Sequence, residues 1–357
     1  MSAVLAERVR VATNPGGNLP AIALLGVGTV GSALLARIAR LRPALKLSSV
    51  ANSRHCLRSI DGIAIAHARE QLPFAPAQCL HEVADTLPGI GSGIVIDATA
   101  SQDVADWHAR WLEQGLVVVT ANKAGTGGRL ADYLAIARHG DRYGDAATVG
   151  AGLPLLRSLR ELRAGGDRIH GIAGVLSGSL AWLFDRYDGM RPFSEWVREA
   201  RALGYTEPDP RLDLSGADVK RKLLILARNA GFALEEDAVE VDSLVPDVLA
   251  GAAADRLDRV LPALDGPLRE RFQAAYKEGR RLRFIARLDG DGRARVGLEA
   301  LERDDPLSAG SGCDNRVALW SCRYAQQPLV IQGPGAGAEV TAAALLDDAL
   351  RLVRSNP

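Results

Sequence analysis

Short apolar runs alternate with segments of helical spacing in the first third of the chain. The runs AIALL (21–25), GIVID (93–97) and LVVVT (116–120) are apolar almost throughout, which is typical of strands buried on both faces of a sheet. A further strand is expected in LKLSSVANS (45–53). Helices are expected at 32–41 and 103–115, where apolar residues recur at helical spacing. This order predicts an α/β fold with a Rossmann-type, doubly wound parallel sheet.

The pattern changes after the glycine-rich turn at 150–152. A helix follows this turn, and the weak alternation of RIHGIAGVL (168–176) predicts a strand. Further helices are expected at 177–187 and 193–204, late strands at 281–290, 294–302, 315–324 and 327–333, and a closing helix at 339–352. These elements predict an α+β part with a mixed, mostly antiparallel sheet.

Local signals place several helix ends in this second part. Pro154 fits the first turn of a helix, and Ser177 and Ser194 are candidate N-caps. Gly204 is expected to end the helix at 193–204.

Composition excludes several classes of function. The 357 residues contain 43 basic and 43 acidic side chains, so the zero net charge gives no case for a nucleic-acid or membrane partner. The four cysteines are scattered and show no metal-ligand spacing. No apolar run is long enough to span a bilayer, and the N-terminus lacks the apolar core of a secretory signal. A cytoplasmic protein with a small-molecule substrate is the expectation.

A glycine motif lies between the first predicted strand and helix. Gly26 permits a tight turn, Gly28 allows the backbone to approach a pyrophosphate, and Gly31 allows close packing of helix on strand. Thr29 and Val30 complete this GxGxxG motif, and the N–H groups of the helix N-terminus favour a phosphate. The motif predicts a dinucleotide site, and a glycine-rich turn in an unrelated α/β unit is the alternative.

The end of the second strand bears on the choice of cofactor. An acidic residue there would bind a ribose 2′-hydroxyl, but the chain has Asn52, Ser53 and Arg54. Arg54 can pair with a 2′-phosphate, which favours NADP over NAD. An ordinary surface arginine is the alternative.

Three more candidate residues follow the later parallel strands. Thr99 and Ser101 come after GIVID, and Lys123 comes after LVVVT. Because ligands bind outside the carboxyl ends of such strands, these residues are expected beside the cofactor.

The stretch GYTEPDPRLDLSGADVKRK (204–222) concentrates charge before an apolar helix. Only five of the 43 basic residues are lysines, so a lysine in an organised context is a candidate for proton transfer, which arginine does not perform. Pro208 and Pro210 exclude a helix around Glu207 and Asp209, which places these two carboxylates on a fixed loop.

The helix that follows brings together a lysine and an aspartate. Ser215 is a candidate cap, and Asp218 and Lys222 lie at i and i+4, on one face. A solvated surface pair is one interpretation. Because the apolar run LLILA follows directly, the alternative is a buried pair in a catalytic cluster, since a buried pair is costly without a function.

From about residue 20 onward, the chain resembles homoserine dehydrogenase. It is most similar to the dehydrogenase half of the bifunctional aspartokinase–homoserine dehydrogenases. The segments that carry the resemblance are GYTEPDPRLDLSGADVKRKLLILAR (204–228), VVTANKAG (118–125), TVGAGLPLLRSL (148–159), GVLSGSLAWLF (174–184) and PLVIQGPGAGAEVTAAALL (328–346).

The resemblance implies a reaction and a domain plan. The family reduces L-aspartate 4-semialdehyde to L-homoserine with NADPH or NADH, in threonine, methionine and isoleucine biosynthesis. It implies a Rossmann domain at 1–148 with a lead-in over 1–20, a catalytic and dimerisation domain at 149–333, and a C-terminal helix at 334–357 that returns to the Rossmann domain. A homodimer is therefore expected. Neither a kinase domain before this chain nor a ligand-sensing module after it is expected, so little inhibition by threonine is expected.

Residue roles are also implied by the resemblance. Lys222 corresponds to the proton donor to the carbonyl oxygen, and Glu207 and Asp218 correspond to substrate-binding carboxylates. Lys123 corresponds to a second active-site lysine that touches cofactor and substrate. The implied additional cofactor contacts are Gly204, Gly335 and Gly337.

The resemblance further implies a monovalent-cation site, with sodium as the candidate ion. Its ligands would be the backbone carbonyls of Ala146, Val149, Ala151 and Leu153. The family commonly has an acidic residue at the position of Ala146, where this chain has none. Carbonyl ligation does not need that side chain, and the neighbouring Asp145 can compensate.

Two other functions are open on the sequence. One is a different semialdehyde or amino-acid dehydrogenase on the same scaffold, against which the run YTEPDPRLDLSGADVKRK argues. The other is a non-catalytic nucleotide sensor, which would be expected to lack Lys222 or Asp218.

Overall fold

The computed structural model describes residues 19–88, 92–310 and 312–355. The predicted lead-in over 1–20 therefore lies almost entirely outside the described residues. The chain forms two compact units. The first unit consists of Met1–Gly125, Ala131–Thr148 and Gly337–Pro357, and the second of Thr126–Leu130 and Val149–Ala336. The domain bounds at 148/149 and 333/334 stay predictions, because compact units need not be domains that fold separately.

The first unit contains a six-stranded sheet in the order β3-β2-β1-β4-β5-β6. Neighbouring strands are parallel except for β3, which is antiparallel to β2. This order confirms the Rossmann-type doubly wound sheet. The strands are β1 (Ala21–Leu25), β2 (Lys46–Ala51), β3 (Cys56–Arg58), β4 (Gly93–Asp97), β5 (Val117–Thr120) and β6 (Tyr143–Gly144).

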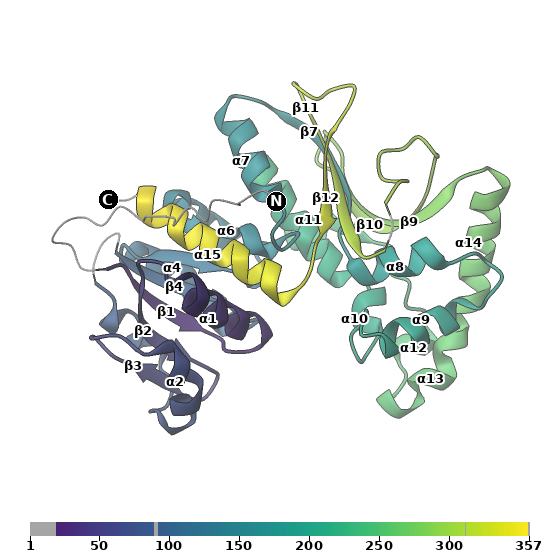
Figure 1. The fold of residues 1–357 in the computed structure, drawn as a ribbon. Helices are drawn as coiled ribbons and strands as arrows, with labels where there is room; N and C mark the ends of the chain where they lie inside the picture. Colours follow the sequence, from purple (N-terminus) through teal and green to yellow (C-terminus); the bar gives the residue numbers. More distant parts are fainter. Residues whose placement is uncertain (1–18, 89–91, 311, 356–357) are drawn as a thin grey trace, which may run out of the picture. The chain divides into compact units, whose positions relative to one another are not determined.

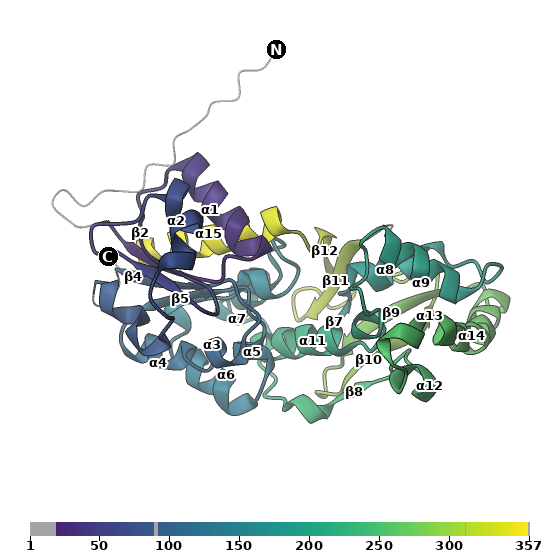
Figure 2. The same ribbon diagram turned by 90° about the horizontal axis from the view of Figure 1, so that it is seen from below.

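Helices cover both faces of this sheet. On one face, α1 (Thr29–Leu41), α2 (Ile65–Gln71) and α15 (Ala338–Ser355) pack over the alternate residues Ile22, Leu24 and Ile96 (Figure 1). On the other face, α4 (His108–Glu113) buries Trp111 and Leu112 against Ala23, Leu25 and Val95 (Figure 2). The short helices α3 (Gln102–Ala105), α5 (Ala124–Gly127) and α6 (Leu130–Ala137) lie at or after the carboxyl ends of β4 and β5.

The single helix predicted at 103–115 is wrong, because the structure has α3 and α4 there. A turn at Asp106 and Trp107 separates them, and the Trp107 N–H donates to the carbonyl of Val104, three residues back. The interruption allows α4 to begin at His108, which is completely buried.

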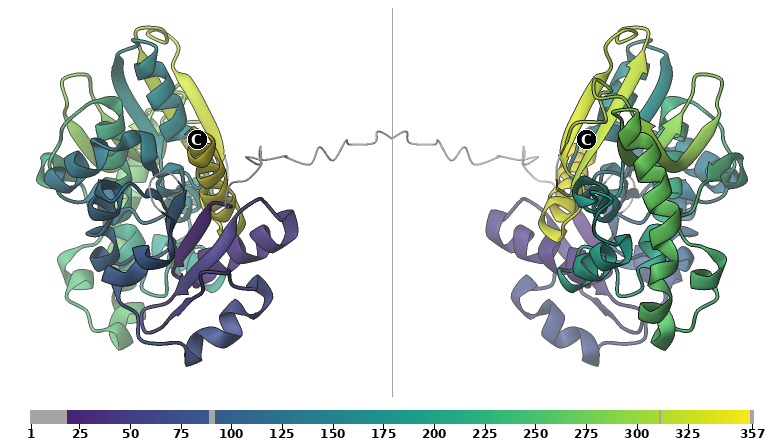
Figure 3. Two further views of the ribbon diagram at one scale, coloured as in Figure 1. Left: turned by 90° about the vertical axis from the view of Figure 1, so that its left-hand side faces the viewer. Right: turned by 90° about the vertical axis from the view of Figure 1, so that its right-hand side faces the viewer.

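The second unit contains a mixed sheet in the order β12-β11-β7-β9-β10-β8. In Figure 3 its late strands, coloured yellow-green, lie beside the teal strand β7. All described pairs are antiparallel except β8 with β10, which confirms the predicted mixed sheet. The strands are β7 (Ile169–Val175), β8 (Val239–Val241), β9 (Arg281–Leu288), β10 (Ala294–Leu301), β11 (Asp314–Ser321) and β12 (Leu329–Pro334).

One apolar core holds the helices of the second unit to the sheet. Residues 223–230 of α11 are buried on all sides, with the core residues Leu155, Ile172 and Phe284 belonging to the same cluster. The helices are α7 (Leu155–Ala164), α8 (Gly178–Arg186), α9 (Phe193–Ala202), α10 (Arg211–Leu214), α11 (Ala217–Ala230), α12 (Asp247–Ala250), α13 (Leu257–Val260) and α14 (Asp265–Lys277). Among the described residues, no helix combines the length and apolar character needed to cross a membrane.

The predicted helix ends are partly correct. Ser177 caps α8 by accepting a hydrogen bond from the Leu180 N–H at 3.2 Å, which confirms that prediction. Pro154 stands one residue before α7 rather than inside its first turn. The cap predicted at Ser194 is wrong, since α9 begins after Pro192 and the buried Ser194 hydroxyl donates to Asp265.

The predicted Ser215 cap is also wrong. The N-cap of α11 is Gly216, whose φ of +75° favours glycine. Ser215 still accepts a hydrogen bond from the Ala217 N–H, at 3.3 Å, so its hydroxyl supports the start of the helix from one residue further back.

Candidate functional site

The three motif glycines of the first unit have different local reasons to be glycine. Gly26 has a φ of +92°, and an added Cβ would lie 2.8 Å from the carbonyl oxygen of Ala98. A Cβ on Gly31 would lie 1.9 Å from the carbonyl oxygen of Gly26, so the helix packs directly on the turn. By contrast, a Cβ on Gly28 would meet nothing within 4 Å. Packing therefore explains Gly26 and Gly31, while Gly28 leaves open space in front of the backbone.

Helix α1 begins at this open space. Gly28 is its N-cap, no side chain caps it, and its first turn contains no acidic residue. Thr29 is exposed and Val30 half-buried. The N–H groups of this first turn, together with the helix dipole, suit a phosphate.

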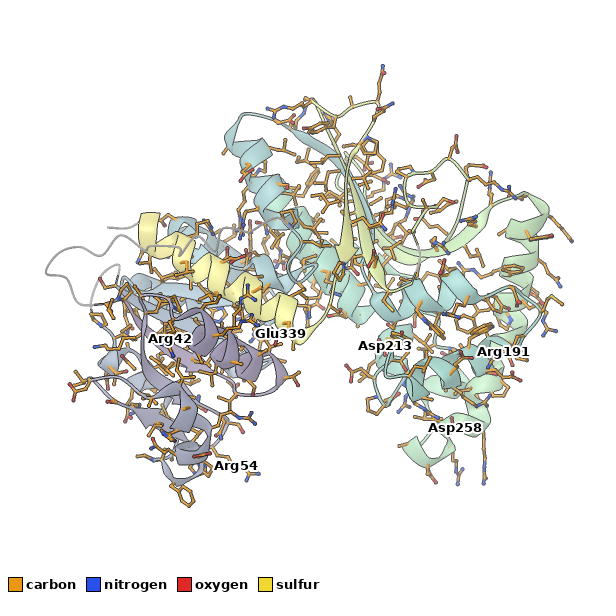
Figure 4. The ribbon with its side chains drawn as sticks, in the orientation of Figure 1. Arg42, Arg54, Arg191, Asp213, Asp258 and Glu339 are labelled. Carbon is orange, nitrogen blue, oxygen red and sulfur yellow. The ribbon has the colours of Figure 1, made fainter. Side chains whose placement is uncertain are left out.

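The loop after β2 is held by Asn52. Its side-chain oxygen accepts hydrogen bonds from the N–H groups of Arg54 and His55, at 2.7 and 2.8 Å. Ser53 and Arg54 are exposed, and the Arg54 side chain extends away from the ribbon (Figure 4). The loop thus presents a hydroxyl and a guanidinium to solvent.

The structure brings the ends of β4 and β5 together. Ser101 accepts a hydrogen bond from the Val104 N–H and so caps α3. The Ser101 carbonyl accepts a hydrogen bond from the side chain of Asn122 at 2.8 Å, and Lys123 follows directly. Thr99, Ser101 and the half-buried Lys123 therefore belong to one cluster at this edge of the sheet. Asn122, which links them, was not identified from the sequence.

In the second unit, Lys222 is fixed by two oxygens. Its Nζ donates to the carbonyl of Leu176 at 2.7 Å and lies 2.9 Å from the Asp218 carboxylate. The predicted i,i+4 pairing on one face is confirmed. The interpretation that both side chains are buried is wrong for Asp218. The Lys222 side chain is 11% exposed, but that of Asp218 is 52% exposed. Asp218 lies in the first turn of α11, before the buried part of the helix begins.

The carbonyl of Leu176 also links Lys222 to Gly335. The buried Asn315 donates to this carbonyl at 3.5 Å. A Cβ on Gly335 would lie 2.0 Å from the Asn315 side chain, so only glycine fits there. Sequence reasoning missed Leu176, because a backbone carbonyl leaves no residue signal, and also missed Asn315. Gly337, with a φ of +128°, belongs to the first unit.

The acidic loop is organised by Asp213, which was not singled out from the sequence (Figure 4). Its carboxylate accepts from the Ser179 hydroxyl at 2.7 Å and from the Glu207 N–H at 2.9 Å. Ser179 in turn lies 2.8 Å from the hydroxyl of Ser177, the residue after Leu176. A chain of contacts thus runs from the backbone of the exposed Glu207 to the segment that holds Lys222.

Other charges in this stretch have structural partners. Arg211 binds Asp209 at 2.6 Å and donates to the carbonyl of Ala252 at 2.8 Å. The hydrogen bonds from Arg211 lower the pKa of Asp209. Both carboxylate oxygens of Asp209 therefore bind Arg211 and fix the loop around the prolines, which favours a structural role for Asp209 over substrate binding.

The ending of α9 explains the glycine at position 204 without any cofactor. It follows α9 with a φ of +74°, the Tyr205 N–H donates to the Ala200 carbonyl at 2.8 Å, and the Gly204 N–H donates to Arg201 at 3.1 Å. These are the two bonds of a Schellman ending. A Cβ on Gly204 would meet nothing within 4 Å, and its cofactor contact stays a prediction.

The four carbonyls predicted to bind a cation are divided between the units, with Ala146 in the first and the others in the second. Val149 and Ala151 are buried, and the Leu153 carbonyl accepts from the Leu155 N–H at 2.8 Å. Within the described part of the chain, no group of three or more His, Cys, Asp or Glu side chains could hold a metal ion.

Family models match both parts of the chain. The model described as homoserine dehydrogenase matches residues 154–350, and the model for the NAD binding domain of homoserine dehydrogenase matches residues 26–140.

Individual proteins agree with these models. The chain is 40% identical to the Escherichia coli bifunctional aspartokinase/homoserine dehydrogenase 2, over 93% of this chain but only 43% of that protein. It is 35% identical to homoserine dehydrogenase of Emericella nidulans, over 93% of this chain and 98% of that protein. A hyperthermophilic archaeal homoserine dehydrogenase in complex with NADPH shares the fold with a TM-score of 0.72 at 20% identity, covering 94% of this chain and 98% of that one. The chain belongs to the homoserine dehydrogenase family.

Proposed function

We propose that this chain catalyses the reversible, NAD(P)H-dependent reduction of L-aspartate 4-semialdehyde to L-homoserine. The observation that carries this proposal is the environment of Lys222, an ammonium group held between the Leu176 carbonyl and Asp218. Family membership gives the reaction class, and the Asp218 carboxylate beside this lysine, with Glu207 as the second proposed carboxylate, gives the substrate class.

Lys222 is suited to donate a proton. An ammonium group has three N–H donors, and two of them are directed to Leu176 and Asp218. The third can bind the carbonyl oxygen of the substrate. When bound, the reduced nicotinamide supplies a hydride to the carbonyl carbon. Lys222 donates the proton to the oxygen, which completes the primary alcohol, and is then reprotonated from solvent.

The carboxylates would bind the other end of the substrate. Aspartate semialdehyde carries an ammonium group, which Glu207 and Asp218 can pair with. Asp213 supports this role by fixing the Glu207 backbone, so that the exposed carboxylate starts from a defined position. Lys123 would contact the substrate and the cofactor from the end of β5.

The open space at Gly28 supports a dinucleotide in the first unit. Gly26, Gly28, Thr29, Val30 and Gly31 would hold the pyrophosphate at the start of α1. Thr99, Ser101 and Lys123 would lie along the bound dinucleotide, with Gly204, Gly335 and Gly337 as further contacts.

NADP(H) is the proposed preference, with NAD(H) as a second cofactor. Asn52 organises a loop that presents Ser53 and Arg54 and carries no acid, which favours a 2′-phosphate. The archaeal relative of known structure was solved with NADPH.

A monovalent cation, sodium, is proposed at the carbonyls of Ala146, Val149, Ala151 and Leu153. Ala151 supports this, because its φ of +51° is unfavourable for a residue with a Cβ, by about 1 kcal/mol. Bound sodium would stabilise this backbone. Thermal unfolding should occur at a higher temperature in sodium chloride than in choline chloride of equal ionic strength. Equal midpoints would refute the site.

We also propose a cytoplasmic homodimer that assembles through the second unit and serves threonine and methionine biosynthesis. The support for this is the resemblance to the family alone. The chain spans only 43% of the length of the Escherichia coli relative, so partners of longer relatives are not transferred. Sedimentation equilibrium would test the dimer directly.

The proposed reaction is tested by substrate comparison. NADPH oxidation is followed with aspartate semialdehyde and with succinic semialdehyde, which lacks the ammonium group. The first should be consumed and converted to homoserine, and the second should react poorly because Glu207 and Asp218 have no cation to bind. Equal rates with both would point to a different semialdehyde dehydrogenase.

A further inference from the structure

A completely buried histidine lies beside the carboxyl end of β4. His108 on α4 is 0% exposed, as is Asp97 at the end of β4, and Tyr143 on β6 is 3% exposed. The His108 Nε2 lies 3.0 Å from Asp97 Oδ2, and its Nδ1 lies 3.0 Å from the Tyr143 hydroxyl. Three polar groups in an apolar core are costly unless each is hydrogen-bonded, and here each is.

Asp97 connects this histidine to both strand ends. Its Oδ1 accepts from the Thr99 N–H at 2.8 Å and the Thr99 hydroxyl at 2.7 Å, while Oδ2 also accepts from Asn122 at 2.9 Å. Burial alone would raise the pKa of Asp97, but the hydrogen bonds from His108 and Thr99 outweigh it and lower the pKa. The carboxylate is therefore ionised and accepts every one of these bonds.

Asn122 converts this network into a fixed turn around Lys123. Its Oδ1 accepts from the Ala124 N–H at 3.0 Å, which closes an Asx-turn with Lys123 at its centre. Its own N–H donates to the Thr120 hydroxyl at 2.8 Å. The backbone is thus fixed on both sides of Lys123, by the Asn122 side chain after it and by the Thr120 hydroxyl before it.

The residue after this turn rests on the imidazole. A Cβ on Gly125 would lie 2.8 Å from His108 Nδ1 and 3.1 Å from the Tyr143 hydroxyl. His108 therefore lies against the residue that follows the turn. Asp97 accepts a hydrogen bond from the Asn122 side chain, which closes the turn.

We infer that Asp97, His108 and Asn122 are positioning residues that set the direction of the Lys123 ammonium group. This inference rests on the proposed function, in which Lys123 contacts substrate and cofactor. The competing explanation is that the network only stabilises the first unit. In that case its loss would affect stability but would not depend on Lys123.

A double-mutant cycle separates the two explanations. Asn122→Ala is expected to lower kcat by about tenfold to a hundredfold, whereas in the Lys123→Ala background the same change should lower kcat less than about threefold. Leu112→Ala, on the same helix as His108 but outside the network, is the control for lost stability. It should lower the melting temperature with kcat nearly unchanged.

A milder substitution, made in the same two backgrounds, controls for loss of folding. Tyr143→Phe removes one hydroxyl and leaves the His108–Asp97 contact, and its smaller loss of kcat should also vanish in the Lys123→Ala background. Equal fold-losses in both backgrounds would overturn the inference, as would full activity of Lys123→Ala. Formation of homoserine by the wild-type protein is measured separately, so failure of the proposed function can be told from failure of this inference.

Discussion

Replacing Lys222 by arginine separates positive charge from proton donation. A guanidinium at this position can still reach the Leu176 carbonyl and the Asp218 carboxylate, which lie 2.7 and 2.9 Å from the native Nζ. It holds its proton too tightly to act as a general acid. Loss of a general acid lowers kcat by about 10²–10⁴-fold, which corresponds to about 3–5 kcal/mol in the barrier. Lys222→Arg and Lys222→Ala should therefore be similarly slow.

The fold should survive both changes. Asp218 is 52% exposed, so removing its partner costs at most about 1 kcal/mol, and the Leu176 carbonyl keeps Asn315 as a donor. Single-turnover hydride transfer on folded, NADPH-saturated protein is the assay. Lys220 on the same helix, 3.8 Å from Glu236, provides the matched controls Lys220→Arg and Lys220→Ala, which should react normally. Near-wild-type transfer in Lys222→Arg would refute proton donation by this residue.

Three further predictions concern the first unit. Gly28→Ala should fold with normal stability, because its Cβ meets nothing within 4 Å, but a titration should show at least about tenfold weaker NADPH binding. Thermal unfolding should show that Gly31→Ala is strongly destabilised, because its Cβ would lie 1.9 Å from the Gly26 carbonyl oxygen. Arg54→Ala should lose about 1–3 kcal/mol of binding free energy for NADPH and little for NADH, whereas Arg69→Ala, another exposed arginine of the unit, should change neither. Since the fold lowers the pKa of Asp97 below its ordinary value of 3.8, the stability it contributes is present above about pH 4 and is lost at lower pH. The free energy of unfolding of Asp97→Asn should therefore fall less steeply between about pH 4 and pH 2 than that of wild type; equal slopes would contradict the assignment.

Much of the fold could be predicted, because its signals are local. Strands buried on both faces are apolar throughout, and the tight contacts of Gly26 and Gly31 leave glycines at fixed spacing. The i,i+4 spacing of Asp218 and Lys222 likewise fixes their shared face. In each case the residues that form the structural feature and the sequence pattern that predicts it lie in the same short segment.

The remaining features depend on contacts between distant segments. Asp213 accepts a hydrogen bond from Ser179, 34 positions away, and the Leu176 carbonyl lies 46 positions from Lys222, so no local pattern reveals either contact. The exposure of Asp218 could not be predicted either, since the apolar run that follows it says nothing about the first turn.

No local pattern between 232 and 280 predicts a helix or strand, but the structure has β8 and α12 to α14 there. Helices α12 and α13 have four residues each, which is too short for a helical period to be visible. In α14, Gly266 and Pro267 in the first turn resemble a loop signal.

Transfer of a deuterium label from the cofactor to the product is the direct test of hydride transfer by this protein. The protein is mixed with L-aspartate 4-semialdehyde and NADPH that carries deuterium at the transferable position of the nicotinamide, and the product is analysed by mass spectrometry. We expect homoserine with a single deuterium, on the carbon that was the aldehyde carbon, at one equivalent per NADPH oxidised. Unlabelled product, or NADPH binding without any conversion of the semialdehyde by folded protein, would contradict it.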